Sequence, residues 1–153
     1  MNRDEHLERG MNLAKVEEYE GALKLFQELP EFTEHSAATS YYALCLAIVE
    51  GKFPKAIALS LAAVKREFYN PEIYLNLGTI YMLNGKKTLA IRVFRRGLHI
   101  DGSHKELKKK ILEMGVRQKP PFSFLSRKNI ANKYLGRVVR GRQQGRGAAR
   151  KIA

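Results

Sequence analysis

Apolar and small residues recur along the chain with a helical period that tight turns interrupt. From residue 71 the recurring positions lie three and four residues apart, at Tyr74, Leu77, Gly78 and Tyr81. The pattern breaks at Asn84-Gly85-Lys86 and resumes through Leu89, Ala90, Val93, Phe94 and Gly97. This spacing indicates amphipathic helices of about 14 residues each. Because Gly85 supplies the positive φ that ends many helices, the segment predicts two helices joined by a tight turn.

The same pattern occurs three times at an interval of 34 residues, without a gap. The aligned columns are Ala22, Ala56 and Ala90; Gly10, Leu44 and Gly78; Phe26, Ser60 and Phe94; and, in the turn, Glu17, Gly51 and Gly85. Pro54 and Pro71 stand near the starts of predicted helices, where a missing N–H is harmless. Gly78 and Ala90 are small enough to let helix axes approach closely beside Phe94. The sequence therefore predicts three helix pairs over residues 3–102, in copies 3–36, 37–70 and 71–104.

These residues resemble the tetratricopeptide repeat (TPR) family, whose motif runs aromatic, Leu-Gly, Tyr, Ala, Phe, Ala and Pro. The third copy matches at Tyr74, Leu77, Gly78, Tyr81, Ala90, Phe94 and Gly97, with Gly102 where the family has Pro. The first copy matches at Gly10, Ala22 and Phe26, whereas the second departs at Leu44 and Ser60. The resemblance implies an all-α, right-handed superhelical solenoid of three TPR helix pairs. It also implies a peptide- or protein-binding scaffold, in a family where catalysis is rare.

A capping helix is expected to follow the third pair, because the last repeat of a solenoid needs a polar outer face. Over residues 103–114, Leu107, Ile111 and Met114 form an apolar stripe and four lysines lie on the other side. Ser103, followed three residues later by Glu106, fits a capping box at the start of this helix.

In the resembled family the first helices of the repeats line a concave groove. The residues expected to face this groove are Leu7, Met11, Tyr41, Cys45, Ile48, Leu75, Thr79 and Met82. TPR domains that bind acidic chaperone C-termini use a clamp of Lys, Asn and Arg there. The corresponding residues are Leu7, Met11, Tyr42, Cys45 and Asn76, so only Asn76 matches. We therefore expect a hydrophobic segment as the occupant; the alternative is that several of these side chains form the core between repeats.

No pattern of catalytic or metal-binding residues stands out. The four histidines are scattered, and His99 and His104 fit no metal-ligand spacing. Cys45 lies in an apolar helix with no histidine near it in sequence, which favours a buried, inert thiol. The glycines near the C-terminus follow no strand and so make no phosphate-binding loop. We expect no enzyme activity, no cofactor and no metal.

Charge divides the chain into a neutral body and a cationic end. The formal net charge is +13, yet residues 1–102 carry 13 acidic and 13 basic side chains, so the excess lies in residues 103–153. No run approaches the roughly 20 apolar residues of a membrane span, and residues 1–9 lack the apolar region of a secretory signal. We expect a cytoplasmic protein; its oligomeric state stays open.

The basic C-terminal extension, residues 115–153, divides into three parts. Phe122 and Phe124 follow Pro120-Pro121 in an extended segment, a basic amphipathic helix is expected at about 127–140, and the rest is expected to be disordered. Three roles stay open: docking on the solenoid, binding an anionic membrane or a partner's groove, and binding nucleic acid through phosphates. The candidate polyanion-binding residues are Arg137, Arg140, Arg142, Arg146, Arg150 and Lys151.

These observations favour a scaffold or adaptor that binds a protein or peptide in the groove. The alternative is a nucleic-acid-associated factor whose basic extension binds a polyanion while the repeats recruit a partner.

Overall fold

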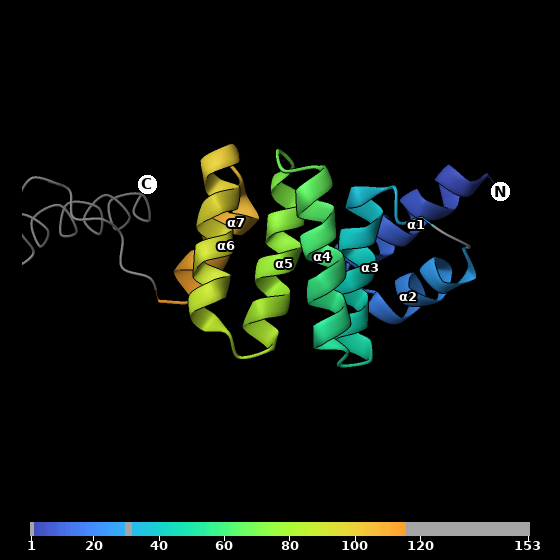
Figure 1. Ribbon diagram of the computed structural model, residues 1–153, viewed down its shortest axis with the longest axis horizontal. Coiled ribbons are helices and arrows are strands. Elements are labelled where there is room, and N and C mark those ends of the chain that lie inside the picture. The colour runs from blue at the N-terminus through green and yellow to red at the C-terminus, as the bar shows by residue number, and fades with distance from the viewer. Residues whose placement is uncertain (1, 30–31, 116–153) are drawn as a thin grey trace, which may run out of the picture. The chain divides into compact units, whose positions relative to one another are not determined.

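The computed structural model describes residues 2–29 and 32–115, and within these ranges every regular element is a helix. The helices are α1 (Arg3–Lys15), α2 (Tyr19–Glu28), α3 (Ser36–Val49), α4 (Phe53–Arg66), α5 (Pro71–Leu83), α6 (Lys87–Ile100) and α7 (Lys105–Glu113). They stack side by side as three helix pairs followed by α7 (Figure 1). Each first helix also packs against the first helix of the next pair, α1 on α3 and α3 on α5. The predicted all-α repeat solenoid is confirmed.

The turns within the pairs have the predicted left-handed backbone. Gly51 and Gly85 have φ values of 65° and 72°, and Glu17 has 65° at the equivalent place in the first pair. Pro54 lies in the first turn of α4 and Pro71 is the first residue of α5, where a proline costs no helical hydrogen bond. The short turns keep the two helices of each pair antiparallel and in contact.

Small residues allow the helices of a pair to cross closely. Ala22, Ala56 and Ala90 are fully buried, as the repeat column predicts. A Cβ atom added to Gly78 would lie 2.3 Å from the ring of Phe94, and one added to Gly10 would lie 2.9 Å from Phe26. The phenylalanine of the second helix therefore occupies the space that the glycine of the first helix leaves.

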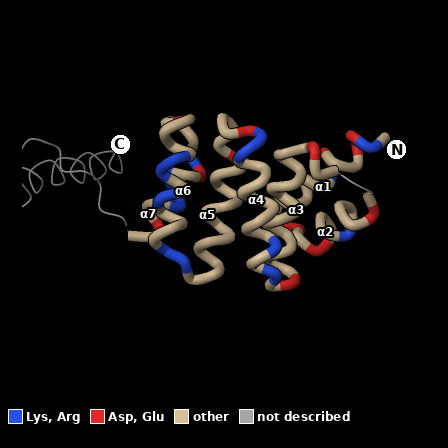
Figure 2. Tube along the Cα trace, viewed as in Figure 1, with Lys and Arg blue, Asp and Glu red and all other residues tan. Residues whose placement is uncertain are grey.

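Helix α3 forms the centre of the stack. It carries no charged residue and buries ten of its 14 residues, and it packs against α1, α2, α4 and α5. Figure 2 shows α3 and most of α5 without charge, whereas α6 and α7 carry several Lys and Arg residues. A helix that is apolar on nearly every side is typical of a core element.

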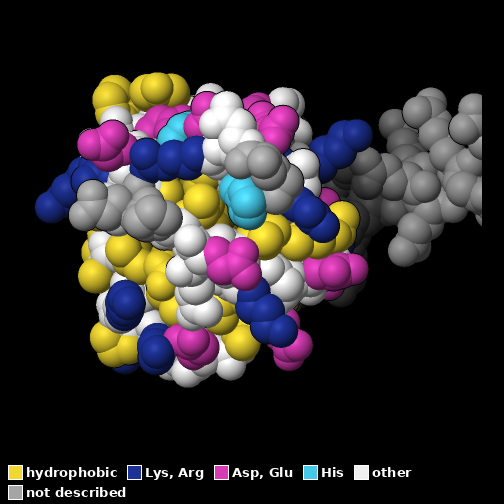
Figure 3. Space-filling view, turned by 90° about the vertical axis from the view of Figure 1, so that its right-hand side faces the viewer, with side chains coloured by type: hydrophobic (Ala, Val, Ile, Leu, Met, Phe, Trp, Pro, Cys, Tyr) yellow, Lys and Arg dark blue, Asp and Glu magenta, His cyan; other side chains and the backbone are white. Residues whose placement is uncertain are grey.

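The two ends of the stack differ. Helix α7 covers the last pair, because Leu107 is fully buried and packs where Gly97 leaves room. At the other end apolar side chains are exposed among charged ones (Figure 3), and Val16 is 66% exposed.

The predicted start of α7 is wrong in its detail. The helix is capped by His104, whose Nδ1 accepts the Leu107 N–H at 3.3 Å, and not by Ser103. Ser103 instead donates its hydroxyl to Asp101 Oδ1 at 2.6 Å. The carboxylate of Asp101 is the stronger local acceptor, so the hydroxyl turns away from the helix.

The predictions for residues 116–153, including the helix at about 127–140 and all six candidate polyanion-binding residues, lie outside the described residues. Within the described part, no helix is long and apolar enough to cross a membrane.

Candidate functional site

The eight residues predicted to face the groove separate by burial. Leu7, Tyr41 and Cys45 are 1%, 5% and 0% exposed, so their side chains belong to the core between the first helices. Four are half-buried: Met11, Leu75, Thr79 and Met82. Ile48 is 37% exposed. The accessible part of the predicted groove therefore lies in these last five residues.

An apolar row runs across the C-terminal ends of α3 and α5. It consists of Ile48, Val49, Met82 and Leu83, and Val49 and Leu83 are 39% and 47% exposed. Ile48 and Met82 are 34 residues apart, as are Val49 and Leu83. Because α3 packs directly on α5 and the two helices run in the same direction, equivalent positions lie side by side. Exposed apolar side chains grouped in this way are typical of an interaction surface.

Val49 and Leu83 were not predicted for the groove, although the repeat contains the signal for them. Each follows a predicted residue directly, and both stand at the end of a first helix, one repeat apart. The last turn of a helix exposes more of its circumference than the middle does. Two successive positions of the repeat therefore become accessible at the end of each of these helices.

A row of polar contacts joins the N-terminal halves of α3 and α5 to the last residue of α1. Tyr41 of α3 donates to Glu72 Oε2 of α5 at 2.9 Å, and His104 Nε2 lies 3.0 Å from Glu72 Oε1. Lys15 of α1 places its Nζ 5.8 Å from the centre of the Tyr41 ring. These four residues, the polar row, link all three first helices to the start of α7.

The hydrogen bonds fix the proton positions in this row. His104 Nδ1 accepts from the Leu107 N–H, so Nε2 carries the proton and donates to Glu72. Burial, and then the neighbouring Glu72 carboxylate, raise the pKa of Tyr41, so its hydroxyl stays a donor. Glu72 is the anionic centre of the row, and its side chain is 41% exposed.

Asn76, the one residue that matches an acid-binding clamp, does not face solvent. It is 3% exposed, and its Nδ2 donates to Ser40 Oγ at 3.0 Å in the core. Its amide therefore holds α3 to α5.

The free thiol and the possible metal ligands are the reactive groups to consider in the described residues. Cys45 is fully buried, as predicted, and burial raises the pKa of its thiol to about 12. Within these ranges no three His, Cys, Asp or Glu side chains come together as metal ligands.

Stacked helix pairs, a 34-residue interval and glycines packed on phenylalanines define a TPR-like helical repeat protein. The fold is similar to the second TPR domain of the human RPAP3 protein, solved by NMR in complex with the HSP70 peptide SGPTIEEVD. The TM-score is 0.56 at 16% sequence identity, over 73% of this chain and 93% of that chain. No family model matches the sequence, and no curated protein matches it. The similarity is therefore one of fold.

Proposed function

We propose that the protein is an interaction scaffold that binds an apolar peptide segment along the first helices, without catalysis. The observation that carries this proposal is the apolar row, because Ile48, Val49 and Leu83 expose 37%, 39% and 47% of their surface at neighbouring, equivalent positions. Keeping such side chains in water costs free energy, roughly 25 cal/mol for each Å² that a partner could cover. The similar RPAP3 domain binds a peptide, which supports the same kind of role here.

The chemistry of the surface favours a partner without an acidic terminus. The HSP70 peptide in the RPAP3 complex ends in Glu-Glu-Val-Asp. Here the corresponding clamp positions are apolar, apart from the buried Asn76, and Glu72 adds a negative charge to the same set of helices. Like charges within a few Å repel, so an acidic terminus would be disfavoured next to Glu72. We infer an apolar segment as the occupant, held by side-chain burial.

A selection from a random peptide library against the full chain tests this proposal. Apolar sequences should be enriched, and the double variant Val49→Glu/Leu83→Glu should bind them at least about tenfold more weakly, because each charge would be desolvated on binding. The matched control is Leu61→Glu on α4, which also replaces an apolar side chain of similar exposure, 41%. Circular dichroism should show all variants folded.

Two results would count against the proposal. Peptides enriched for acidic C-termini would indicate a carboxylate-binding groove, in spite of the residues present. Equal loss of binding in the Leu61→Glu control would indicate that the peptides recognise exposed apolar surface in general.

A further inference from the structure

The second helices of the last two pairs carry only positive charge. Helices α4 and α6 contain no Asp or Glu. Their seven basic residues, here called the outer basic surface, are Lys55, Lys65, Arg66, Lys87, Arg92, Arg95 and Arg96. By contrast α2, the second helix of the first pair, has Glu20 and Glu28 against Lys24. Residues 1–102 carry no net charge in total, yet α4 and α6 carry a strong excess of positive charge.

These basic side chains are available to a ligand. All seven are exposed, and none forms an ion pair with another described residue. Arg66 also donates to the carbonyl of Thr33, which leaves its charge uncompensated. Like charges concentrated on α4 and α6 repel one another, so the excess as a whole does not arise from the needs of the fold.

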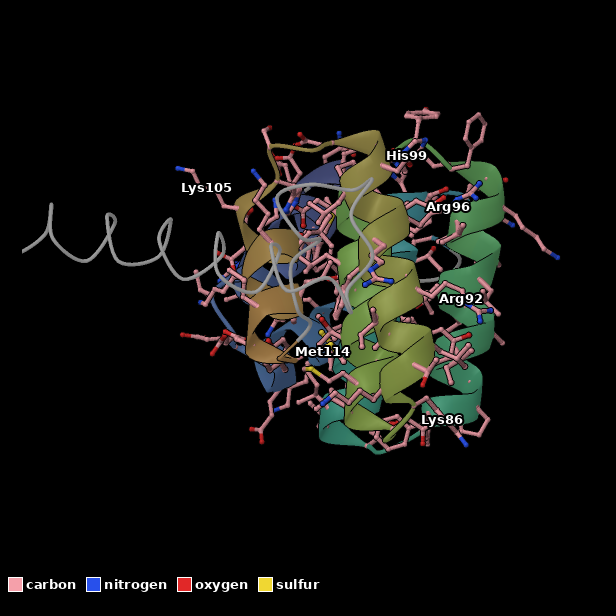
Figure 4. All side chains as sticks on the ribbon, turned by 90° about the vertical axis from the view of Figure 1, so that its left-hand side faces the viewer. Lys86, Arg92, Arg96, His99, Lys105 and Met114 are labelled. Atoms are coloured by element: carbon pink, nitrogen blue, oxygen red, sulfur yellow. The ribbon has the colours of Figure 1, made fainter. Side chains whose placement is uncertain are left out.

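On α6 the arginines are arranged along one side. Arg92, Arg96 and His99 are spaced by four and three residues, which places them in a line on a helix. Figure 4 shows these residues along α6, with Lys86 at its beginning. A shallow groove beside this line is lined by Thr88, Ile91, Arg92 and Arg95. Guanidinium groups in a row suit phosphates, which they bind through two parallel hydrogen bonds.

Two exposed aromatic rings follow the basic end of α4. Phe68 and Tyr69 are 65% and 64% exposed, and their ring centres are 5.7 Å apart, edge to face. The loop is held in place, because Tyr74 donates its hydroxyl to the Phe68 carbonyl at 2.9 Å. Helices α4 and α6 end at the same edge of the stack (Figure 1). The rings therefore lie at the edge where both basic helices end.

We propose that the outer basic surface, together with Phe68 and Tyr69, binds single-stranded nucleic acid. Arginines and lysines would contact successive phosphates, and an unpaired base would stack on the exposed rings. Stacking on aromatic side chains and phosphate contacts are the two components of single-strand binding that needs no defined sequence. An acidic polypeptide could pair with the basic side chains, but it would leave the exposed rings without a stacking partner. A single-stranded nucleic acid accounts for both the basic side chains and the rings. The residues differ from those of the apolar row, and the proposal does not depend on the peptide-binding role.

A single tryptophan reporter tests the contact directly in the full chain. The protein contains no Trp, so Tyr69→Trp introduces a unique fluorophore at the proposed stacking site. Addition of a 12-nucleotide oligo-dT or oligo-U should quench its emission, because a stacked base quenches indole fluorescence. The control is Leu112→Trp on α7, a similarly exposed position at 57%, whose emission should change little.

The charge contribution is tested by the salt dependence of binding. Each phosphate contact to a single strand contributes about −0.7 to the slope of log affinity against log salt, so Arg92→Gln/Arg96→Gln should make the slope shallower by about 1.4. Arg9→Gln/Lys24→Gln removes the same charge from exposed positions on α1 and α2 and should leave the slope unchanged. Because every variant carries the same C-terminal extension, the difference between their salt slopes does not include the extension's contribution.

Several outcomes would overturn the proposal. Equal quenching at both tryptophans, or equal slopes in the two double variants, would mean that the oligonucleotide binds elsewhere. A response of Tyr69→Trp to anionic phosphatidylserine vesicles and not to oligonucleotides would assign the surface to a membrane. Tight binding of poly-glutamate that competes fully with the oligonucleotide, without quenching by either, would assign it to an acidic protein.

Discussion

At the scale of single residues, the contact between the helices of each pair is a matter of matched volumes. The first and third pairs place glycine on the first helix and phenylalanine on the second, at Gly10 with Phe26 and Gly78 with Phe94. The second pair has Leu44 and Ser60 in these columns, both buried. In the second pair the larger residue therefore lies on the first helix and the small residue on the second. The summed side-chain volume at the contact stays similar. The apparent departure of the second copy from the TPR motif is thus a compensated exchange.

Adding one methyl group at Gly78 tests this packing. In Gly78→Ala the new Cβ would lie 2.3 Å from the Phe94 ring, which itself is fully buried and cannot move freely. We expect the free energy of unfolding to fall by about 1–3 kcal/mol. The control is Gly21→Ala in α2, where the new Cβ would have only an ordinary contact of 3.6 Å. That variant should be more stable by about 0.5–1 kcal/mol, because alanine is the better helix former. Equal destabilisation in urea titrations of both would contradict the packing.

Ser60 provides a second test at this scale. Its hydroxyl is fully buried and has no hydrogen-bond partner among the described residues. Ser60→Ala should therefore raise the free energy of unfolding by about 1 kcal/mol, because an unsatisfied polar group leaves the core. Ser40→Ala is the matched change, and it should lower the free energy by about 1–3 kcal/mol, since it leaves the buried Asn76 amide without its acceptor. The same sign in thermal melts of the two variants would refute this explanation.

At the scale of elements, the turns explain why the helices end where they do. Glu17 has a φ of 65° at the position where the other two turns have Gly51 and Gly85. A side chain in this region is strained by about 1 kcal/mol or more. Glu17→Gly should therefore stabilise the protein by roughly 0.5–1 kcal/mol, whereas Gly85→Ala should destabilise it by a similar amount. Chemical denaturation of the two variants measures both effects, and a loss of stability in Glu17→Gly would contradict the assignment.

The helices could be predicted from the sequence because their signals are local. The three- and four-residue spacing, the turn glycines and the prolines at helix starts each depend on a few neighbouring residues. The cap of α7 could not be predicted from the sequence. Ser103 donates its hydroxyl to Asp101, and His104 caps the helix instead.

The groove could be predicted only in part, because exposure depends on packing between repeats. Tyr41 and Cys45 lie on the predicted side of α3, yet α1 and α5 cover them. The same packing leaves the last turns of α3 and α5 accessible, and this exposes Val49 and Leu83. The polar row needs Lys15, Tyr41, Glu72 and His104 from four elements, and no local pattern in the sequence relates them.

At the scale of the whole molecule, the buried thiol of Cys45 in α3 makes the stability of the stack sensitive to high pH. Burial raises the pKa of Cys45 from 9.0 to about 12. The unfolded chain therefore loses this proton near pH 9 while the folded chain keeps it, so the free energy of unfolding should fall as the pH rises from 9 to 12. The slope contributed by one thiol is at most about 1.4 kcal/mol per pH unit.

Cys45→Ala should make the fall between pH 9 and 12 shallower. Tyr41 contributes a fall of the same sign from about pH 10 upward, because burial and the nearby Glu72 carboxylate raise its pKa in the folded chain. Urea titrations across this range compare the two chains. An identical pH dependence with and without the thiol would mean that Cys45 is not buried as described.

The two proposed surfaces would give the molecule separate binding capacities. The apolar row lies at the ends of α3 and α5, whereas the outer basic surface lies on α4 and α6. Separate helices allow both partners to be bound at once, as a scaffold requires.

The methionine methyl groups of the full chain can report whether a peptide binds along the first helices. The chain has four methionines. Met11 of α1 and Met82 of α5 are half-buried on the predicted face, whereas Met114 lies at the end of α7 and is 9% exposed. With methyl-labelled protein and an apolar peptide from the selection, the NMR signals of Met11 and Met82 should shift and saturate together while that of Met114 stays in place. A shift of Met114 with Met11 and Met82 unmoved would contradict binding along the first helices.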